Sequence, residues 1–177
     1  MAVSPTGDKV YIVHRTTTFD PSTAGWVSVV SVADWRVVGT VQVDTEAGDA
    51  ALSPDGSSLF VISARSPTLW AIDTNTLSVR TLSLGDRPGG VATDPSGTLL
   101  YVATAIGLEV ISLPALVPLY VIPLRESVNN RAESVAVSPD GRHVYVGQIR
   151  DAANGEVVVI DTSTRQIVRR RGMFNPG

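Results

Sequence analysis

The chain has 177 residues, enough for one ordinary domain with a substantial core, and no stretch indicates a second domain. Hydrophobic residues make up 44% and charged residues only 18%, and 15 Gly with 11 Pro favour frequent turns over long amphipathic helices, which predicts an all-β fold. A net charge of −3 excludes a general basic field for nucleic acid, and the lack of cysteine excludes disulfides and thiol chemistry.

The chain also lacks the usual signals for membranes and metals. No apolar run approaches the roughly 18 residues of a membrane-spanning helix, and the opening MAVSPTGDKV has neither a basic nor an apolar segment, so no secretory signal is predicted. HExxH, Cys/His spacings, the EF-hand string and GxSxG are all missing from the sequence. We therefore expect no membrane span, no metal site and no cofactor.

Four segments in chain order share one pattern. They are AVSPTGDKVYIV (2–13), ALSPDGSSLFVI (51–62), VATDPSGTLLYVA (91–103) and AVSPDGRHVYVG (136–147). In each, a turn glycine is followed four positions later by an aromatic residue: Gly7/Tyr11, Gly56/Phe60, Gly97/Tyr101 and Gly141/Tyr145. Proline presets φ and glycine accepts a positive φ, so each segment predicts two antiparallel strands joined by a tight turn.

Two more strands are predicted after each of these segments. Third strands are expected at 26–32, 68–73, 108–113 and 156–161, and fourth strands at 36–43, 78–84, 118–124 and 166–171. The unbroken apolar run EVVVID (156–161) predicts burial on both faces, whereas QIVRRR (166–171) predicts a polar outermost strand. Asp73, Asp161, Ser31 and Ser112 align and carry side-chain oxygens that can close the turn into the fourth strand.

The spacing of the units predicts the architecture. Counted from Ser4 to Ser53, Asp94 and Ser138, the units are 49, 41 and 44 residues long. Periods of about 40 to 50 residues with short strands are typical of β-propeller blades, each a four-stranded sheet. We therefore predict a single all-β propeller domain (1–177) of four-stranded antiparallel blades, at approximately 1–48, 49–89, 90–132 and 133–177.

The repeat resembles the YVTN-type β-propeller family, whose units read approximately AVSPDG..VYV......VSVIDT.T..VV.TI.VG..P.G. The match is closest in SVAVSPDGRHVYVGQIRDAANGEVVVIDTSTRQIV (134–168), while SVADWR and SLPALV replace the IDT.T phrase in units one and three. The resemblance implies a ring of more than four blades, commonly seven, and an extracytoplasmic location. Relatives with similar blades include lactonases and domains that house haem d1 or quinone cofactors.

Four blades of a larger ring would leave two apolar sheet faces uncovered, more than a soluble monomer tolerates. Three arrangements would cover them, and we expect them in this order. The sequence is part of a longer chain; two copies self-associate into an eight-blade ring; or four blades close alone.

The irregular loops predict the functional rim. Loops between second and third strands, and connections between blades, vary in length, and irregular loops on a rigid scaffold are where propellers place function. The predicted ligand-binding residues on this rim are His14, Arg15, Arg65, Arg87, Arg125, Arg131 and Arg150. Arginines gathered on this rim can bind an anionic or polar ligand through paired hydrogen bonds. The alternative is that they are ordinary solvent-exposed loop residues. Trp26, Trp35 and Trp70 are expected to pack between sheets or cap blade edges.

The sequence favours a non-catalytic binding or scaffold module, because no catalytic constellation is present. Its expected partner is a protein, a glycan or a small polar ligand, and no nucleic acid is expected. The resemblance implies one alternative, a lactonase-like hydrolase in which His14 and the rim arginines act on an anionic sugar lactone.

Overall fold

The computed structural model describes residues 1–14, 25–43, 46–63, 65–124, 131–149 and 154–174. Within these ranges the chain forms four separate antiparallel sheets of four strands each, in which the strand order follows the chain. The all-β prediction is therefore confirmed, and so are the four-stranded units. No described residue belongs to a helix long and apolar enough to cross a membrane.

The strands of each sheet run from the innermost to the outermost in chain order. Sheet 1 comprises β1 (Ala2–Val3), β2 (Lys9–His14), β3 (Gly25–Ser31) and β4 (Arg36–Val43), and sheet 2 comprises β5 (Ala47–Leu52), β6 (Ser58–Ser63), β7 (Thr68–Asp73) and β8 (Val79–Ser83). Sheet 3 comprises β9 (Pro88–Thr93), β10 (Leu99–Thr104), β11 (Gly107–Ser112) and β12 (Val117–Pro123), and sheet 4 comprises β13 (Arg131–Val137), β14 (His143–Ile149), β15 (Asn154–Asp161) and β16 (Gln166–Phe174).

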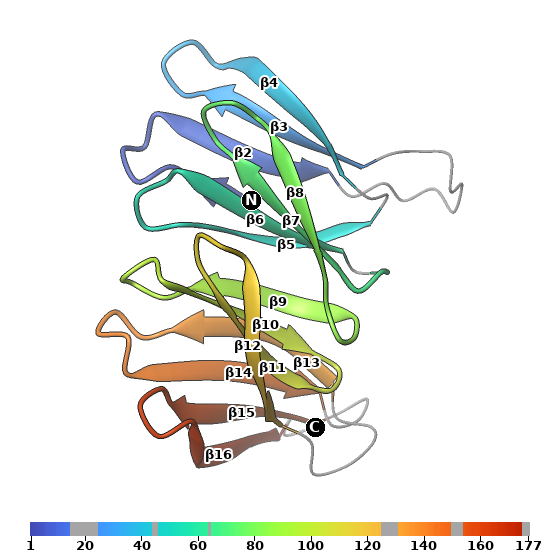
Figure 1. Ribbon diagram of the computed structural model, residues 1–177, viewed down its shortest axis with the longest axis vertical. Helices are drawn as coiled ribbons and strands as arrows, with labels where there is room; N and C mark the ends of the chain where they lie inside the picture. Colours follow the sequence, from blue (N-terminus) through green and yellow to red (C-terminus); the bar gives the residue numbers. More distant parts are fainter. Residues whose placement is uncertain (15–24, 44–45, 64, 125–130, 150–153, 175–177) are drawn as a thin grey trace.

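The four sheets stack face to face along the long axis of the molecule, with sheet 1 at the top and sheet 4 at the bottom of Figure 1. The inner strands β5, β9 and β13 are neighbours, and β9 is linked to β5 by the Thr93 hydroxyl, which donates to the Leu52 carbonyl at 2.8 Å. Sheets 1 and 4 lie at opposite ends, so the chain by itself forms an open arc rather than a closed ring (Figure 1).

The turn between the first and second strands is the same in all four sheets. Its glycine has a φ between 70° and 73° in every copy, a conformation that other residues adopt only with strain. Its amide donates to the carbonyl three residues earlier, at 2.8 Å for Gly56 to Ser53 and 2.8 Å for Gly141 to Ser138. The sequence prediction of this turn is confirmed, and these turns lie on the left of Figure 1.

The turn between the third and fourth strands is closed as predicted by side-chain oxygen. The Asp161 carboxylate accepts from the amides of Ser163 at 3.0 Å and Thr164 at 2.8 Å, and Asp73 accepts equivalently from Asn75 and Thr76. Hydrogen bonds from the Ser163 hydroxyl and the Thr164 amide lower the pKa of Asp161 to about 2. Each of these turns contains one non-glycine residue with positive φ: Trp35 (52°), Leu77 (59°), Leu116 (62°) and Arg165 (60°).

The hydrophobic core consists of three clusters, each between two consecutive sheets. The repeated aromatic residue of one sheet packs against the next sheet, so Tyr11, Phe60 and Tyr101 are 2%, 3% and 3% exposed. Burial also raises the pKa of the Tyr101 phenol to about 12. The fourth aromatic, Tyr145, is 40% exposed, because no sheet follows sheet 4 in the described part of the chain.

The same geometry corrects one sequence prediction. The run 156–161 is not buried on both faces: Val158 and Ile160 are buried against sheet 3, whereas Val157 and Val159 on the other face are only half-buried. An unbroken apolar run indicates two faces that can be covered, but its burial depends on a neighbouring sheet being there.

Candidate functional site

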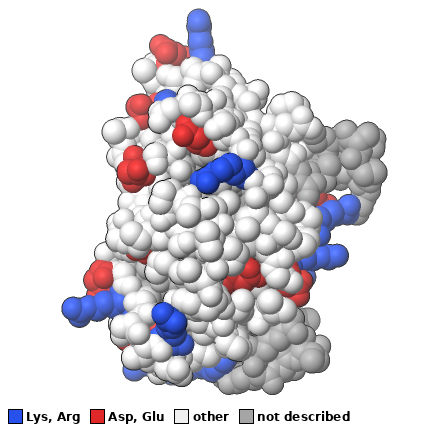
Figure 2. All heavy atoms as spheres, in the orientation of Figure 1, with Lys and Arg blue, Asp and Glu red and all other residues white. Residues whose placement is uncertain are grey.

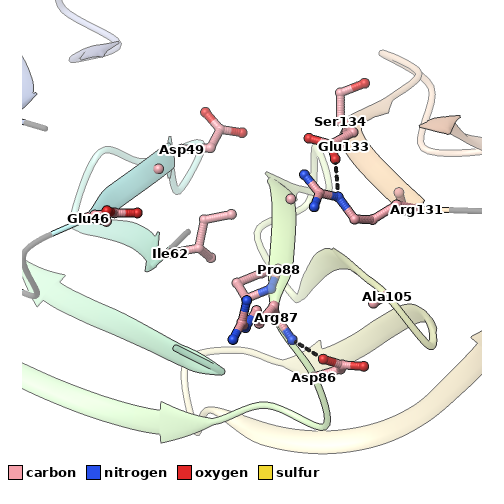
Figure 3. A pocket seen from close by; sticks show the side chains of 13 residues that line it. Glu46, Asp49, Ile62, Asp86, Arg87, Pro88, Ala105, Arg131, Glu133 and Ser134 are labelled. Carbon is pink, nitrogen blue, oxygen red and sulfur yellow. Dashed lines mark hydrogen bonds and ion pairs between the residues drawn. The ribbon is translucent and has the colours of Figure 1, made fainter. Parts of the chain in front are cut away.

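A pocket of about 900 Å³ opens where the inner strands β5, β9 and β13 begin. It lies at the connection between β8 and β9, on the side of the sheets opposite the turns between the first and second strands (Figure 1). Uncharged residues such as Ile62, Pro88 and Ser134 form part of its lining (Figure 3). Six charged residues also line it: Glu46, Asp49, Asp86, Arg87, Arg131 and Glu133. In Figure 2, acidic side chains lie together over this same connection, with basic side chains beside them at the right edge of the view.

Two glycines allow the strands under the pocket to approach closely. A β-carbon at Gly89 would lie 2.1 Å from the Ala132 carbonyl oxygen, and one at Gly90 would lie 2.7 Å from the Ser134 Cα. Because both obstacles are backbone atoms of β13, no side-chain rotation could relieve the contact. Gly89 and Gly90 therefore fix the spacing of β9 and β13 and the width of the pocket floor.

Most of the charged groups in the pocket have partners. Arg131 pairs with Glu133, and Glu46 pairs with Arg65 at 2.9 Å. Asp49 accepts from the amides of Ala50 at 2.8 Å and Val91 at 3.3 Å, so this carboxylate ties sheet 2 to sheet 3.

Arg87 differs from these residues. Its backbone amide donates to the Asp86 carboxylate at 2.7 Å, but its exposed guanidinium has no hydrogen-bond or ion-pair partner among the described residues. Figure 3 shows Arg87 between the side of the pocket formed by Glu46 and Ile62 and the side formed by Asp86. It is a cation available to a bound molecule.

Glu109 supports the connection that carries Arg87. This buried side chain in β11 accepts a hydrogen bond from the Gly85 amide at 2.8 Å, immediately before Asp86. Burial raises the pKa of the Glu109 carboxyl above its ordinary value, although hydrogen bonds from the backbone of Gly85 and Asp86 oppose the shift. Glu109 thus anchors the connection between β8 and β9, and burying its charge lowers the stability of the fold.

This arrangement predicts a pH-dependent gain from Glu109→Gln. A raised carboxyl pKa contributes stability that is present below the unfolded-state pKa and is lost as the pH rises through the folded-state pKa. Glutamine keeps the acceptor for Gly85 without the charge, so we expect it to stabilise the fold more at about pH 7.5 than at about pH 5, because the cost of the buried charge grows as the pH rises. Urea unfolding at both pH values measures the difference, and a gain independent of pH would contradict the prediction.

The predicted site residues separate in the structure. Arg87 and Arg131 line the pocket, and Arg65 reaches it through Glu46. His14 does not line it: it ends β2 in sheet 1, where its Nε2 lies 2.8 Å from the Ser28 hydroxyl. Arg15, Arg125 and Arg150 lie outside the described residues.

Sequence reasoning did not single out the acidic side of this pocket. The four acidic residues lie in the same connections between blades as the arginines: Glu46, Asp49, Asp86 and Glu133. Their position on the rim could therefore be predicted from the sequence, but their role in the pocket could not. Glu109 also had a signal, since it is the one charged residue within the apolar run GLEVISL (107–113). Among the described residues no group of three or more His, Cys, Asp or Glu is placed to hold a metal ion.

Four-stranded antiparallel sheets that stack face to face, with their innermost strands side by side, define the chain as a β-propeller. The chain is 28% identical over 169 residues to dihydro-heme d1 dehydrogenase of Pseudomonas aeruginosa, covering 92% of this chain and 32% of that protein. It superposes on hydrazine synthase of Kuenenia stuttgartiensis with a TM-score of 0.83 at 24% identity, covering 97% of this chain and 48% of the other.

A second solved structure shows the same fold. The Cps50 (Swd1) β-propeller domain of Myceliophteria thermophila gives a TM-score of 0.77 at 14% identity, covering 96% of this chain and 53% of the other. The chain therefore spans about a third of the curated relative and about half of these two structures. No family model matches the sequence.

Proposed function

We propose that this chain is a non-catalytic binding module of the YVTN-type β-propeller kind, and that the pocket at Arg87 binds a polar ligand with one anionic group. The observation that carries the proposal is the exposed Arg87 guanidinium, which has no partner among the described residues, within a pocket whose other charges are engaged. A guanidinium can bind a carboxylate through two parallel hydrogen bonds.

The carboxylates beside Arg87 narrow the ligand further. Asp49 and Asp86 each have lone pairs beyond the amide bonds that they accept, so they favour a ligand that also donates hydrogen bonds. A purely anionic ligand would be repelled by the four lining carboxylates. A peptide segment with an acidic side chain, or an acidic sugar with several hydroxyls, meets both conditions.

Binding can be tested with a small panel of probes that contains glutamate-bearing dipeptides and glucuronate. We expect at least one probe to raise the melting temperature, and Arg87→Gln to weaken its binding at least about tenfold, the usual loss for a charge-assisted pair. Arg142→Gln is the matched control, because Arg142 is an exposed arginine in the turn between β13 and β14. No binding by any probe, or equal binding by the wild type and Arg87→Gln, would overturn the proposal.

Two alternatives receive less support from the residues of this pocket. A lactonase in which His14 acts beside the rim arginines needs these groups together, and His14 lies in sheet 1 outside the pocket. The name of the curated relative points to a haem-type substrate. However, no described lining residue is a His, Cys, Met or Tyr of the kind that ligates haem iron.

A further inference from the structure

The positive-φ residue in the turn between third and fourth strands fills a hollow on the preceding sheet. Leu77 of sheet 2 packs on sheet 1, where its Cδ1 is 2.6 Å from the position of a β-carbon at Gly39. Leu116 of sheet 3 is buried in the cluster that contains Phe60 of sheet 2. Arg165 of sheet 4 lies over the Tyr120 ring of sheet 3, 4.1 Å from its centroid. Every internal interface thus has an occupant from the same turn position.

The fourth residue of this series has no hollow to fill within the described chain. Trp35 occupies the same turn position in sheet 1, with φ of 52°, and its side chain is 78% exposed. A large apolar ring in that state is exceptional, because the strained φ and the exposed surface are both unfavourable for a non-glycine residue.

The corresponding hollow on sheet 4 is not filled by any described residue. It measures about 320 Å³, lies on the uncovered face of sheet 4 and is lined by His143, Tyr145, Val159, Val168 and Arg169. Strand register identifies its members: Val159 pairs with Tyr145 and Arg169, just as Val110 in sheet 3 pairs with Tyr101 and Tyr120. Arg169 therefore stands where Tyr120 receives Arg165.

A second repeated contact, between a proline and a glycine of the first turns, is missing at the same two uncovered faces of sheets 1 and 4. The proline of each first turn packs beside the turn glycine of the next sheet: a β-carbon at Gly56, Gly97 or Gly141 would lie 2.7, 3.4 or 3.6 Å from Pro5, Pro54 or Pro95. Nothing described lies within 4 Å of the same position at Gly7. Sheet 1 thus lacks a preceding proline, and Pro139 of sheet 4 is the next member of the series.

We propose that a second copy of this chain covers these faces. Trp35 of each copy inserts into the hollow between Tyr145 and Arg169 of the other, and Pro139 of one packs beside Gly7 of the other. The indole ring and the Arg169 guanidinium then form a cation–π pair, with the two roles exchanged relative to Arg165 and Tyr120.

The second copy is favoured as occupant for two reasons. Both complementary surfaces belong to one chain and are the same kinds of surface that pair at its three internal interfaces. The chain also overlays 48% and 53% of the two propeller chains compared above, so two copies supply about one such chain. Such head-to-tail contacts close on themselves when the rotation permits.

The experiment measures the solution mass of the 177-residue chain by light scattering across a concentration series. We expect about twice 18.7 kDa for the wild type and about 18.7 kDa for Trp35→Asn and for Tyr145→Asp at the same concentration. Asparagine tolerates the positive φ better than tryptophan, so Trp35→Asn keeps the fold, which its melting temperature checks. Leu119→Asn is the control, because Leu119 is an exposed apolar residue on β12 of an internal sheet.

Three results would overturn the proposal. A wild-type monomer at all soluble concentrations would mean that a sheet other than one from a second copy covers the faces. A ladder of ever larger species would mean open-ended association. A dimer that survives both Trp35→Asn and Tyr145→Asp would use a different surface. None of these results bears on Arg87, so this inference and the proposed function fail separately.

Discussion

Replacement of Tyr101 with alanine is expected to lower the free energy of unfolding by roughly 3–5 kcal/mol, the range for truncating a buried aromatic side chain. The ring lies in the cluster between sheets 3 and 4, against Val144 and Val146, and sheet 4 cannot close over the space that the mutation leaves. Urea unfolding followed by circular dichroism measures the loss.

Tyr145→Ala is the matched control, because Tyr145 has the same place in sheet 4 as Tyr101 in sheet 3. At concentrations where the chain is monomeric we expect a loss of at most about 1–2 kcal/mol, since the ring is partly exposed there. Equal losses for the two substitutions would mean that burial against the following sheet does not govern stability in this fold.

Arg170→Met is expected to destabilise the chain by up to about 3 kcal/mol, the low end of the range for breaking a buried ion pair, because Arg170 is itself partly exposed. The Arg170 guanidinium donates to Glu156 at 3.2 Å and to the Leu124 carbonyl at 3.0 Å, so it joins sheet 4 to the end of sheet 3. Glu156 is fully buried and would lose this cation. Thermal and urea unfolding both measure the effect.

Two further variants separate charge from packing. Glu156→Gln in the Arg170→Met background removes the buried charge and is expected to restore a large part of the lost stability. Arg171→Met, at an exposed neighbouring position on β16, is expected to change stability by at most about 0.5 kcal/mol. If the double variant were no more stable than Arg170→Met, the Leu124 contact rather than the charge of Glu156 would be responsible.

The strands were predictable because their signals are local. The expected strands at 36–43 and 68–73 coincide with β4 and β7, and the others are within three residues at either end. Turn glycines, turn aspartates and the alternation around each aromatic residue act over a few residues, so they need no knowledge of the neighbouring sheet. The fourfold repetition of these signals then indicated the number of units.

Features that depend on neighbouring sheets were not predictable. The burial of 156–161 required knowledge of what covers each face, and the different states of Tyr101 and Tyr145 have no counterpart in their local sequences. The pocket has the same character. Arg87 and Arg131 were expected on one rim, but their position near Asp49 and the support of Arg87's loop by Glu109 follow from the stacking of sheets 2, 3 and 4.

Leu77, Leu116 and Arg165 each join their own blade to the blade before it, and among the described residues the main contacts between blades join consecutive blades. Stability in such an array is approximately a sum over nearest neighbours. An insertion of one whole unit replaces one junction by two equivalent ones, a deletion of an internal unit replaces two junctions by one, and the remaining junctions are unchanged. Arcs of different length are therefore accessible from the same sequence unit, whereas an insertion of part of a unit would leave one sheet with the wrong number of strands.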